Sequence, residues 1–225
     1  MYMLPIVSTS HSQTVVANLK KRRLNKKTLI WIVSLWVVLT LVNYYFVPYF
    51  IVALEWIVIS LILLIWTIGQ IVKLIKERKN LTRQRIASVL VISTLFLLTF
   101  FRQPVNQIIE KADWYMFYNK RTEVVEQVKN GELKPNVSWN GWVCELPYEF
   151  PVISNGGNDI GISKNDSTDE VTVTFWVFRN FFSAPSTHFV YTNRPEDIKY
   201  YNELIQRNPD DNWKIKENWY RTFHE

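Results

Sequence analysis

The sequence is poor in the residues and motifs that usually reveal an activity. Cysteine occurs once, at Cys144, so no disulfide can form within the chain and any folded region must be held by its own core. The three histidines, His11, His188 and His224, are far apart, and neither metal-ligand spacing nor a nucleophile elbow accompanies them. We therefore expect no metal, no cofactor and no catalytic residue, and an enzyme is the less favoured class.

Charge is nearly absent from two long apolar runs. The first covers residues 28–75, where Glu55 and Lys73 are the only charged residues, and the second covers residues 86–101. A bilayer core about 30 Å thick requires about 20 apolar residues per helix. The first run therefore predicts two spans, 29–46 and 50–72, and the second predicts a third span, 86–101. Pro48 marks the break within the first run, because proline cannot donate a helical hydrogen bond.

Two alternatives apply to these runs. Residues 28–75 could form one long kinked helix, and residues 86–101 could form a buried helix of a soluble domain. The basic stretch before the first run could also belong to a cleaved signal peptide, but the apolar segment is too long and no small-residue cleavage site follows it. Three uncleaved spans are the preferred interpretation.

The orientation follows from lysine and arginine in the short flanks. Two groups of six flank the spans: Lys20, Lys21, Arg22, Arg23, Lys26 and Lys27 precede the first, and Lys73, Lys76, Arg78, Lys79, Arg83 and Arg85 lie between the second and third. The connection between the first two spans has none. Such clusters favour the cytoplasmic side. We expect a cytoplasmic basic tail at 1–27, a three-span region within 28–102, and an extracytoplasmic domain at 103–225 in a multi-pass cell-membrane protein.

The charge balance differs between these two regions. Residues 1–102 carry 13 Lys and Arg against two acids, a net charge of +11, whereas residues 103–225 carry 13 against 18, a net charge of −5. The basic residues thus lie beside the spans, where they face anionic lipid. The bilayer is therefore an expected partner, nucleic acid is not, and a second protein is the further partner that we expect.

The periodicity changes after the spans. Apolar residues recur at threes and fours over 104–130, which predicts a helix that begins near Pro104 and ends at Asn130-Gly131. Alternation begins at residue 137 and predicts an extended segment over 139–146 that ends at Pro147. Further strands are expected over 159–163, 171–178, 187–192, 213–216 and 219–223, and a short helix over 196–206. The sequence therefore predicts three membrane helices followed by a small α+β domain with an antiparallel sheet.

Four residues are candidates for a functional role. Glu55 is an ionisable residue inside a span, which by default suggests proton relay or helix pairing, although it lies close enough to the end of the span to reach the interface. His188 could act as a general base if the fold brought an acid to it. Phe181 and Phe182 fall between two strands, where exposed aromatic residues would contact a partner or the membrane surface. A structural role is the alternative for each.

Other motifs have simpler explanations. Asn155-Gly156-Gly157-Asn158 lacks the Lys-Ser/Thr of a phosphate loop and precedes a strand, so it predicts a turn. Cys144 is expected to be a structural residue of a strand. Asp210-Asp211 lies in a turn and is expected to be solvated. Trp114, Tyr115 and Tyr118 could contact lipid headgroups or pack under the sheet.

Five short segments after the spans stand out: Cys144-Glu145-Leu146-Pro147, Gly156-Gly157-Asn158-Asp159-Ile160, Val173-Thr174-Phe175-Trp176-Val177-Phe178-Arg179, Phe189-Val190-Tyr191-Thr192 and Glu217-Asn218-Trp219-Tyr220. On these segments, the region is similar to C-terminal modules of uncharacterised bacterial, chiefly Gram-positive, multi-pass membrane proteins. The resemblance implies a bacterial origin and an exterior module, and it implies no catalytic residue.

These observations favour one functional hypothesis over two others. The first is a membrane protein that displays an exterior binding or interaction module, either to protect its host from an exported toxin or as an accessory subunit of a surface assembly. The second is a membrane-anchored hydrolase that uses His188. The third is a transport or signalling subunit that depends on Glu55.

Overall fold

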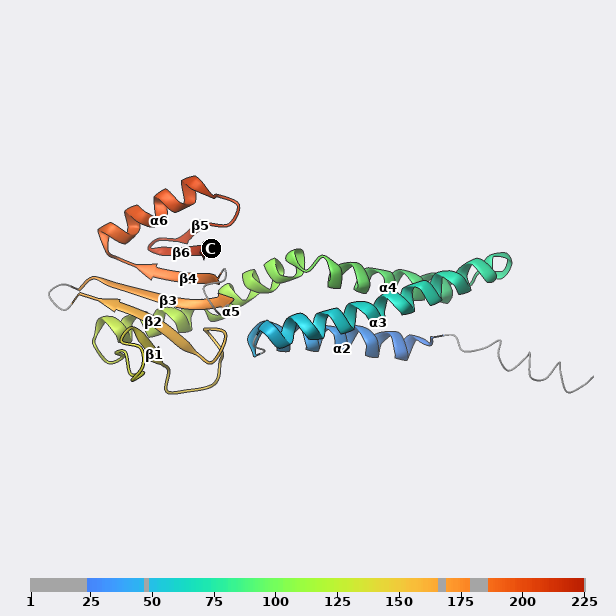
Figure 1. Ribbon diagram of the computed structural model, residues 1–225, viewed down its shortest axis with the longest axis horizontal. Helices are drawn as coiled ribbons and strands as arrows, with labels where there is room; N and C mark the ends of the chain where they lie inside the picture. Colours follow the sequence, from blue (N-terminus) through green and yellow to red (C-terminus); the bar gives the residue numbers. More distant parts are fainter. Residues whose placement is uncertain (1–23, 47–48, 166–168, 179–185, 225) are drawn as a thin grey trace, which may run out of the picture. The chain divides into compact units, whose positions relative to one another are not determined.

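Three apolar helices precede a sheet domain in the computed structural model, which describes residues 24–46, 49–165, 169–178 and 186–224 (Figure 1). The helices are α2 (Lys26–Tyr45), α3 (Tyr49–Lys76) and α4 (Arg83–Phe100), and the short 3-10 helix η1 (Arg78–Asn80) connects the last two. Each of the three is long and apolar enough to cross a membrane. The prediction of three membrane helices is confirmed, and the interpretation of residues 28–75 as one kinked helix is wrong.

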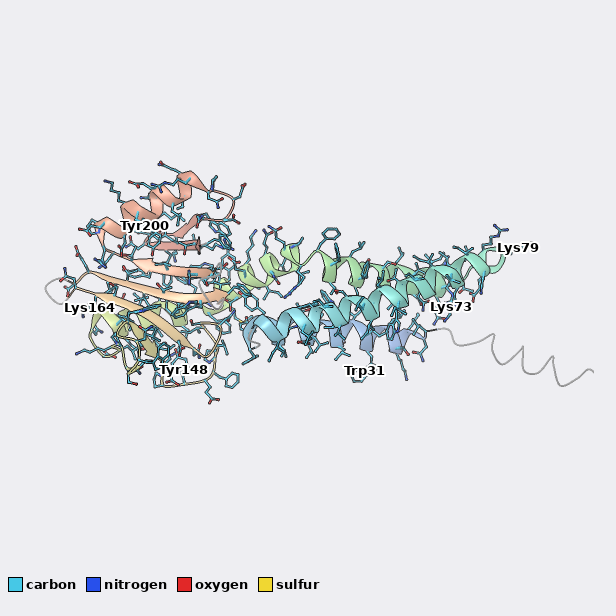
Figure 2. The ribbon with its side chains drawn as sticks, viewed as in Figure 1. Trp31, Lys73, Lys79, Tyr148, Lys164 and Tyr200 are labelled. Carbon is cyan, nitrogen blue, oxygen red and sulfur yellow. The ribbon has the colours of Figure 1, made fainter. Side chains whose placement is uncertain are left out.

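The outward surface of these helices is apolar, as a lipid environment requires. Trp31, for example, is 75% exposed and points away from α2 (Figure 2). Lys73 and Lys79 lie near the turn between α3 and α4 in the same view. Leucine, isoleucine and valine make up most of the other exposed large side chains of these helices. Burial within the protein therefore does not account for this composition, whereas contact with lipid does.

A long helix and a six-stranded antiparallel sheet follow. The helix is α5 (Gln103–Lys129), with Pro104 in its first turn and Gly131 beyond its end at a φ of 74°. The strands are β1 (Val143–Glu145), β2 (Asp159–Lys164), β3 (Val171–Phe178), β4 (Ser186–Thr192), β5 (Trp213–Lys216) and β6 (Trp219–His224). Their order is β1-β2-β3-β4-β6-β5, which Figure 1 shows as a ladder of neighbouring arrows. The predicted α+β class is confirmed.

The first strand is shorter than the alternation from residue 137 suggests. Ser138 and Trp139 form a turn between Val137 and Asn140, which an isolated bridge joins, and Gly141 and Trp142 form a further turn. The side chain of Asn140 accepts a hydrogen bond from the backbone N–H of Trp142 at 3.1 Å. An asparagine that bonds the backbone two residues later favours a turn over an extended strand.

Helix α5 covers one face of the sheet. Trp114 is 6% exposed, and its ring lies 4.9 Å from that of Phe189 and 5.1 Å from that of Trp219. Val124 and Val128 are fully buried in the same core. Trp114 therefore packs under the sheet, whereas Tyr115 is 80% exposed. A core of this kind is what a single helix can provide for one face of a small sheet.

Helix α6 (Pro195–Arg207) contacts the other face. The Tyr201 ring stacks on that of Tyr220 at 5.3 Å, and the Asp197 carboxylate accepts a hydrogen bond from the Thr172 hydroxyl. Strand register assigns His188 to this face, because its partner is Thr222, whereas the adjacent pair Phe189 and Arg221 faces α5. Side chains alternate between the two faces along each strand.

The chain divides into two compact units. The first contains residues 24–36 and 60–97, and the second contains residues 37–59 together with residues 98–224. The second unit thus includes the last part of α2 and the first part of α3 as well as the sheet domain. Tyr44 of α2 packs against the sheet core within this unit. The boundary between units therefore does not coincide with the expected domain boundary at residue 103.

Candidate functional site

The second unit contains an open cleft of about 1350 Å³. Its walls come from the last turn of α2, the first two turns of α5, the segment that joins β1 to β2, and residues beside or within the other strands at one end of the sheet. Ligand sites in proteins are concave, and most have volumes of about 300–1,000 Å³. This cleft is therefore large enough for a ligand bigger than a typical small molecule.

Asn158 organises the wall between β1 and β2. Its side-chain oxygen accepts hydrogen bonds from the backbone N–H groups of Ile153 and Ser154, at 2.8 and 3.2 Å. Its amide nitrogen donates to the carbonyls of Tyr148, Glu149 and Pro151 at 2.9–3.2 Å. Asn158 is 2% exposed and has a φ of 58°, a conformation that asparagine adopts more readily than most residues. One buried side chain therefore holds the whole segment.

An ion pair closes one side of the cleft. The Arg221 Nε atom in β6 donates to a Glu110 carboxylate oxygen in α5 at 2.9 Å, and both side chains are 12% exposed. The Arg221 guanidinium also lies 4.7 Å from the centre of the Trp213 ring and donates to the Asp211 carbonyl. Because Glu110 and Arg221 neutralise each other, this part of the lining carries no unpaired charge.

A second, deeper ion pair connects α5 with its surroundings. Arg121 donates to a carboxylate oxygen of Asp113 at 2.5 Å and to the Ile153 carbonyl at 2.9 Å, and Arg121 and Asp113 are each 2% exposed as side chains. The Tyr45 hydroxyl at the end of α2 donates to the other Asp113 oxygen at 3.0 Å. Burial raises the pKa of Asp113, and the adjacent Arg121 charge opposes that rise. The network thus joins α2, α5 and the cleft wall through one carboxylate.

Other polar groups of the lining have no partner among the described residues. Asn43 is 7% exposed, and neither its side-chain oxygen nor its side-chain nitrogen is hydrogen-bonded. The Tyr44 hydroxyl and the Arg102 Nε atom are likewise unsatisfied. Buried polar groups nearly always have partners, because a buried donor or acceptor without a hydrogen bond costs about 1–3 kcal/mol. These atoms are buried as well as unpaired, so a ligand in the cleft could bond them only after the wall shifts.

The planar guanidinium of Arg102 packs against an aromatic ring. Its guanidinium lies 4.3 Å from the centre of the Trp56 ring, a cation–π arrangement. Burial lowers the pKa of Arg102 to about 10, and the Glu55 carboxylate counteracts that decrease. The group therefore stays charged at neutral pH, and its Nε atom has no hydrogen-bond partner among the described residues. Glu55 itself, the candidate from the sequence, is partly exposed in α3 and does not line the cleft.

The remaining sequence candidates lie elsewhere. His188 is partly exposed on the sheet face opposite α5, and its ring lies 6.0 Å from that of Trp176. Glu110 and Arg221, the charged pair of the cleft, are on the α5 face. Phe181 and Phe182 fall outside the described residues. Glu55 and His188, the two candidates that the structure describes, therefore do not belong to this cleft.

Cys144 has the surroundings of a structural residue. It is completely buried in β1, and burial raises the pKa of its thiol, with Asp159 and Glu145 acting in the same direction. A reactive cysteine needs a lowered pKa and access to solvent. No group of three metal-ligating side chains occurs in the parts of the chain that the structure describes.

Sequence reasoning missed most of the cleft. The sequence patterns did not single out Asn43 or Arg102, and Asp210-Asp211 was recognised only as a turn. Their common feature is a position beside a membrane boundary or a strand end. That feature is visible in the sequence, but the convergence of these segments on one cleft depends on the sheet order.

Comparison of the chain with protein-family models, with curated proteins and with solved structures finds no match. The fold and the cleft define a class of protein. It is a three-helix membrane protein that carries an α+β domain with a large cleft, and some polar groups of the cleft lining are unpaired.

Proposed function

We propose that this protein is a multi-pass membrane protein that displays the sheet domain outside the cytoplasm and binds a partner there. The orientation is supported by the twelve lysines and arginines that flank the spans, six before α2 or at its start and six around the α3–α4 turn. Positive charge in short flanks favours the cytoplasmic side. The domain that follows α4 is then on the outer side of the membrane.

The observation that carries the binding role is the cleft with its unsatisfied Asn43. The Asn43 carboxamide lines the cleft without a partner among the described residues, whereas the equally buried Asp113 and Arg121 bond each other. The absence of a metal cluster among the described residues and the burial of Cys144 leave the described part of the cleft without a group for metal or thiol chemistry. Binding is therefore the role that these contacts support, as expected of an immunity protein or an accessory subunit.

Site-directed thiol labelling tests the orientation. Cys144 is completely buried, so the wild-type chain gives a low background with a membrane-impermeant maleimide. Asn202 in α6 and Lys79 beside the α3–α4 turn are both exposed, so each tolerates a cysteine. We expect Asn202→Cys to be labelled on intact cells and Lys79→Cys only after permeabilisation. The reverse pattern would contradict the proposal.

A further inference from the structure

The cleft follows one end of the sheet from edge to edge. It is lined by Glu145 at the end of β1, Phe178 at the end of β3, Thr187 at the start of β4 and Trp213 at the start of β5. Strands β1 and β5 are the two edges of the sheet, five strand intervals apart. At about 4.8 Å per interval this distance is about 24 Å, which about seven residues of extended chain would cover. The shape therefore suits an elongated ligand.

The ends of this cleft are acidic. Glu145 and Glu149 lie at the β1 end, and Asp210 and Asp211 lie at the β5 end. Glu145, Glu149 and Asp210 form no ion pair within the described part of the chain. With Glu110, the lining has five carboxylates against two arginines, and Glu110 is already paired with Arg221. The excess negative charge favours a ligand that has positive charges at both ends.

Aromatic side chains lie between and around these acids. Phe46, Trp139, Phe150 and Phe178 all line the cleft and are 45–73% exposed. The Phe46 and Phe150 rings are 5.9 Å apart, so α2 and the β1–β2 segment share one apolar patch. Aromatic faces attract both apolar side chains and cations. A ligand that alternates basic and apolar residues would satisfy both kinds of lining.

Asn43 indicates that the ligand has peptide groups. It is a carboxamide more than nine-tenths buried in the cleft wall, its oxygen and nitrogen have no partner among the described residues, and a shift of the wall would bring both into the cleft. A carboxamide can pair with the N–H and C=O of a main chain at the same time. A simple metal or ammonium ion would leave its donor unpaired. The amide therefore favours a peptide over a small cation.

We propose that the cleft binds an extended, basic and amphipathic peptide segment of about seven residues. The Asn43 amide bonds its main chain, Glu145 and Glu149 receive one basic end, and Asp210 and Asp211 receive the other. This inference rests on the proposed binding function and specifies the chemistry of its partner. It does not depend on which side of the membrane carries the domain, so thiol labelling and peptide binding can fail independently.

Fluorescence polarisation with the full-length protein in a nonionic detergent tests the proposal. The probe is a labelled octapeptide of alternating lysine and leucine, and its control has glutamate in place of lysine. We expect saturable binding of the basic peptide that weakens as salt increases, because screening is substantial above about 0.1 M. Equal or tighter binding of the acidic peptide, or no saturable binding of the basic one, would overturn the proposal.

Matched variants locate the site. Glu145→Gln/Glu149→Gln should weaken binding of the basic peptide about three- to tenfold, since exposed charge pairs contribute up to about 1 kcal/mol each. Glu196→Gln/Glu203→Gln on α6 makes the same change in net charge away from the cleft and should leave binding unchanged. Equal weakening by both double variants would show a general effect of charge and would overturn the cleft as the site.

One single variant completes the test. Asn43→Leu should weaken binding of the basic peptide about tenfold while the unfolding temperature stays the same or rises, because no existing hydrogen bond is lost. Unchanged binding in a folded Asn43→Leu protein would contradict the role of the amide.

Discussion

Arginines close both ends of the third apolar helix, and their surroundings differ. Arg85 in the first unit is 4% exposed and uses all three guanidinium nitrogens: it donates to both Glu77 carboxylate oxygens at 2.9 and 3.1 Å and to the side-chain amide oxygen of Gln70 at 2.9 Å. Arg102 in the second unit has a donor without a partner and is held by the Trp56 ring. Paired polar groups such as Arg85 stabilise the fold, whereas an unpaired group that lines a cleft can gain a bond when a ligand binds.

The same contrast exists inside the second unit. Asp113 and Arg121 are as buried as Asn43, but they bond each other, whereas the amide of Asn43 bonds nothing among the described residues. Variants that separate stability from binding therefore test the account. Those at paired groups should lower stability most, and those at unpaired groups should change it little or raise it.

The largest effect is expected for Asp113→Ala. It leaves the Arg121 guanidinium buried without its carboxylate, and breaking a buried pair in this way costs about 3–5 kcal/mol. Thermal unfolding in detergent should show a much lower midpoint. Glu203→Ala, which breaks an exposed pair with Arg207, is the control and should change stability by about 0.5 kcal/mol or less. A shift no larger than that of the control would contradict the structural role of the pair.

Asn158→Ala should have the next largest effect. It removes five hydrogen bonds to the cleft wall and places alanine at a positive φ, for an expected loss of about 2–4 kcal/mol. Asn202→Ala on the exposed face of α6 is a matched change without these contacts. Proteolysis of the native protein should show earlier cleavage within residues 146–158, and cleavage at the wild-type rate would count against this organisation of the wall.

Arg85→Gln and Arg102→Gln compare the two arginines directly. Arg85→Gln loses charge-assisted bonds to Glu77 and should cost about 1–3 kcal/mol, with Glu77 able to turn toward solvent because it is 34% exposed. Arg102→Gln loses a cation–π contact worth about 1 kcal/mol. Unfolding midpoints measured side by side should therefore be lower for Arg85→Gln, and the opposite order would break the comparison.

The smallest effect, and the only one expected to be stabilising, is that of Asn43→Leu. An unpaired buried amide is replaced by an apolar group of similar volume, so stability should stay the same or rise by about 1 kcal/mol. The midpoint of thermal unfolding measures it. A loss of more than about 1 kcal/mol would show that Asn43 has a structural partner in solution.

The coarse fold could be predicted from the sequence because its signals are local. The nearly uncharged runs on either side of residues 76–85 specify the membrane helices, and the β-branched and aromatic residues of 171–178 specify the central strand. The cleft could not be predicted, because it depends on contacts such as Arg221 with Glu110, 111 residues away in the chain. The turn at Asn140-Gly141 was missed because the alternation around it outweighed its turn residues.

The shift in unfolding temperature caused by the basic octapeptide tests most directly whether the unpaired polar groups of the cleft bind a ligand. A ligand at 100 times its Kd stabilises the folded state by about 2.7 kcal/mol. The account predicts a clear upward shift for the wild type and for Arg85→Gln, and a much smaller one for Asn43→Leu and Glu145→Gln/Glu149→Gln at the same peptide concentration. Equal shifts in all four proteins would contradict it.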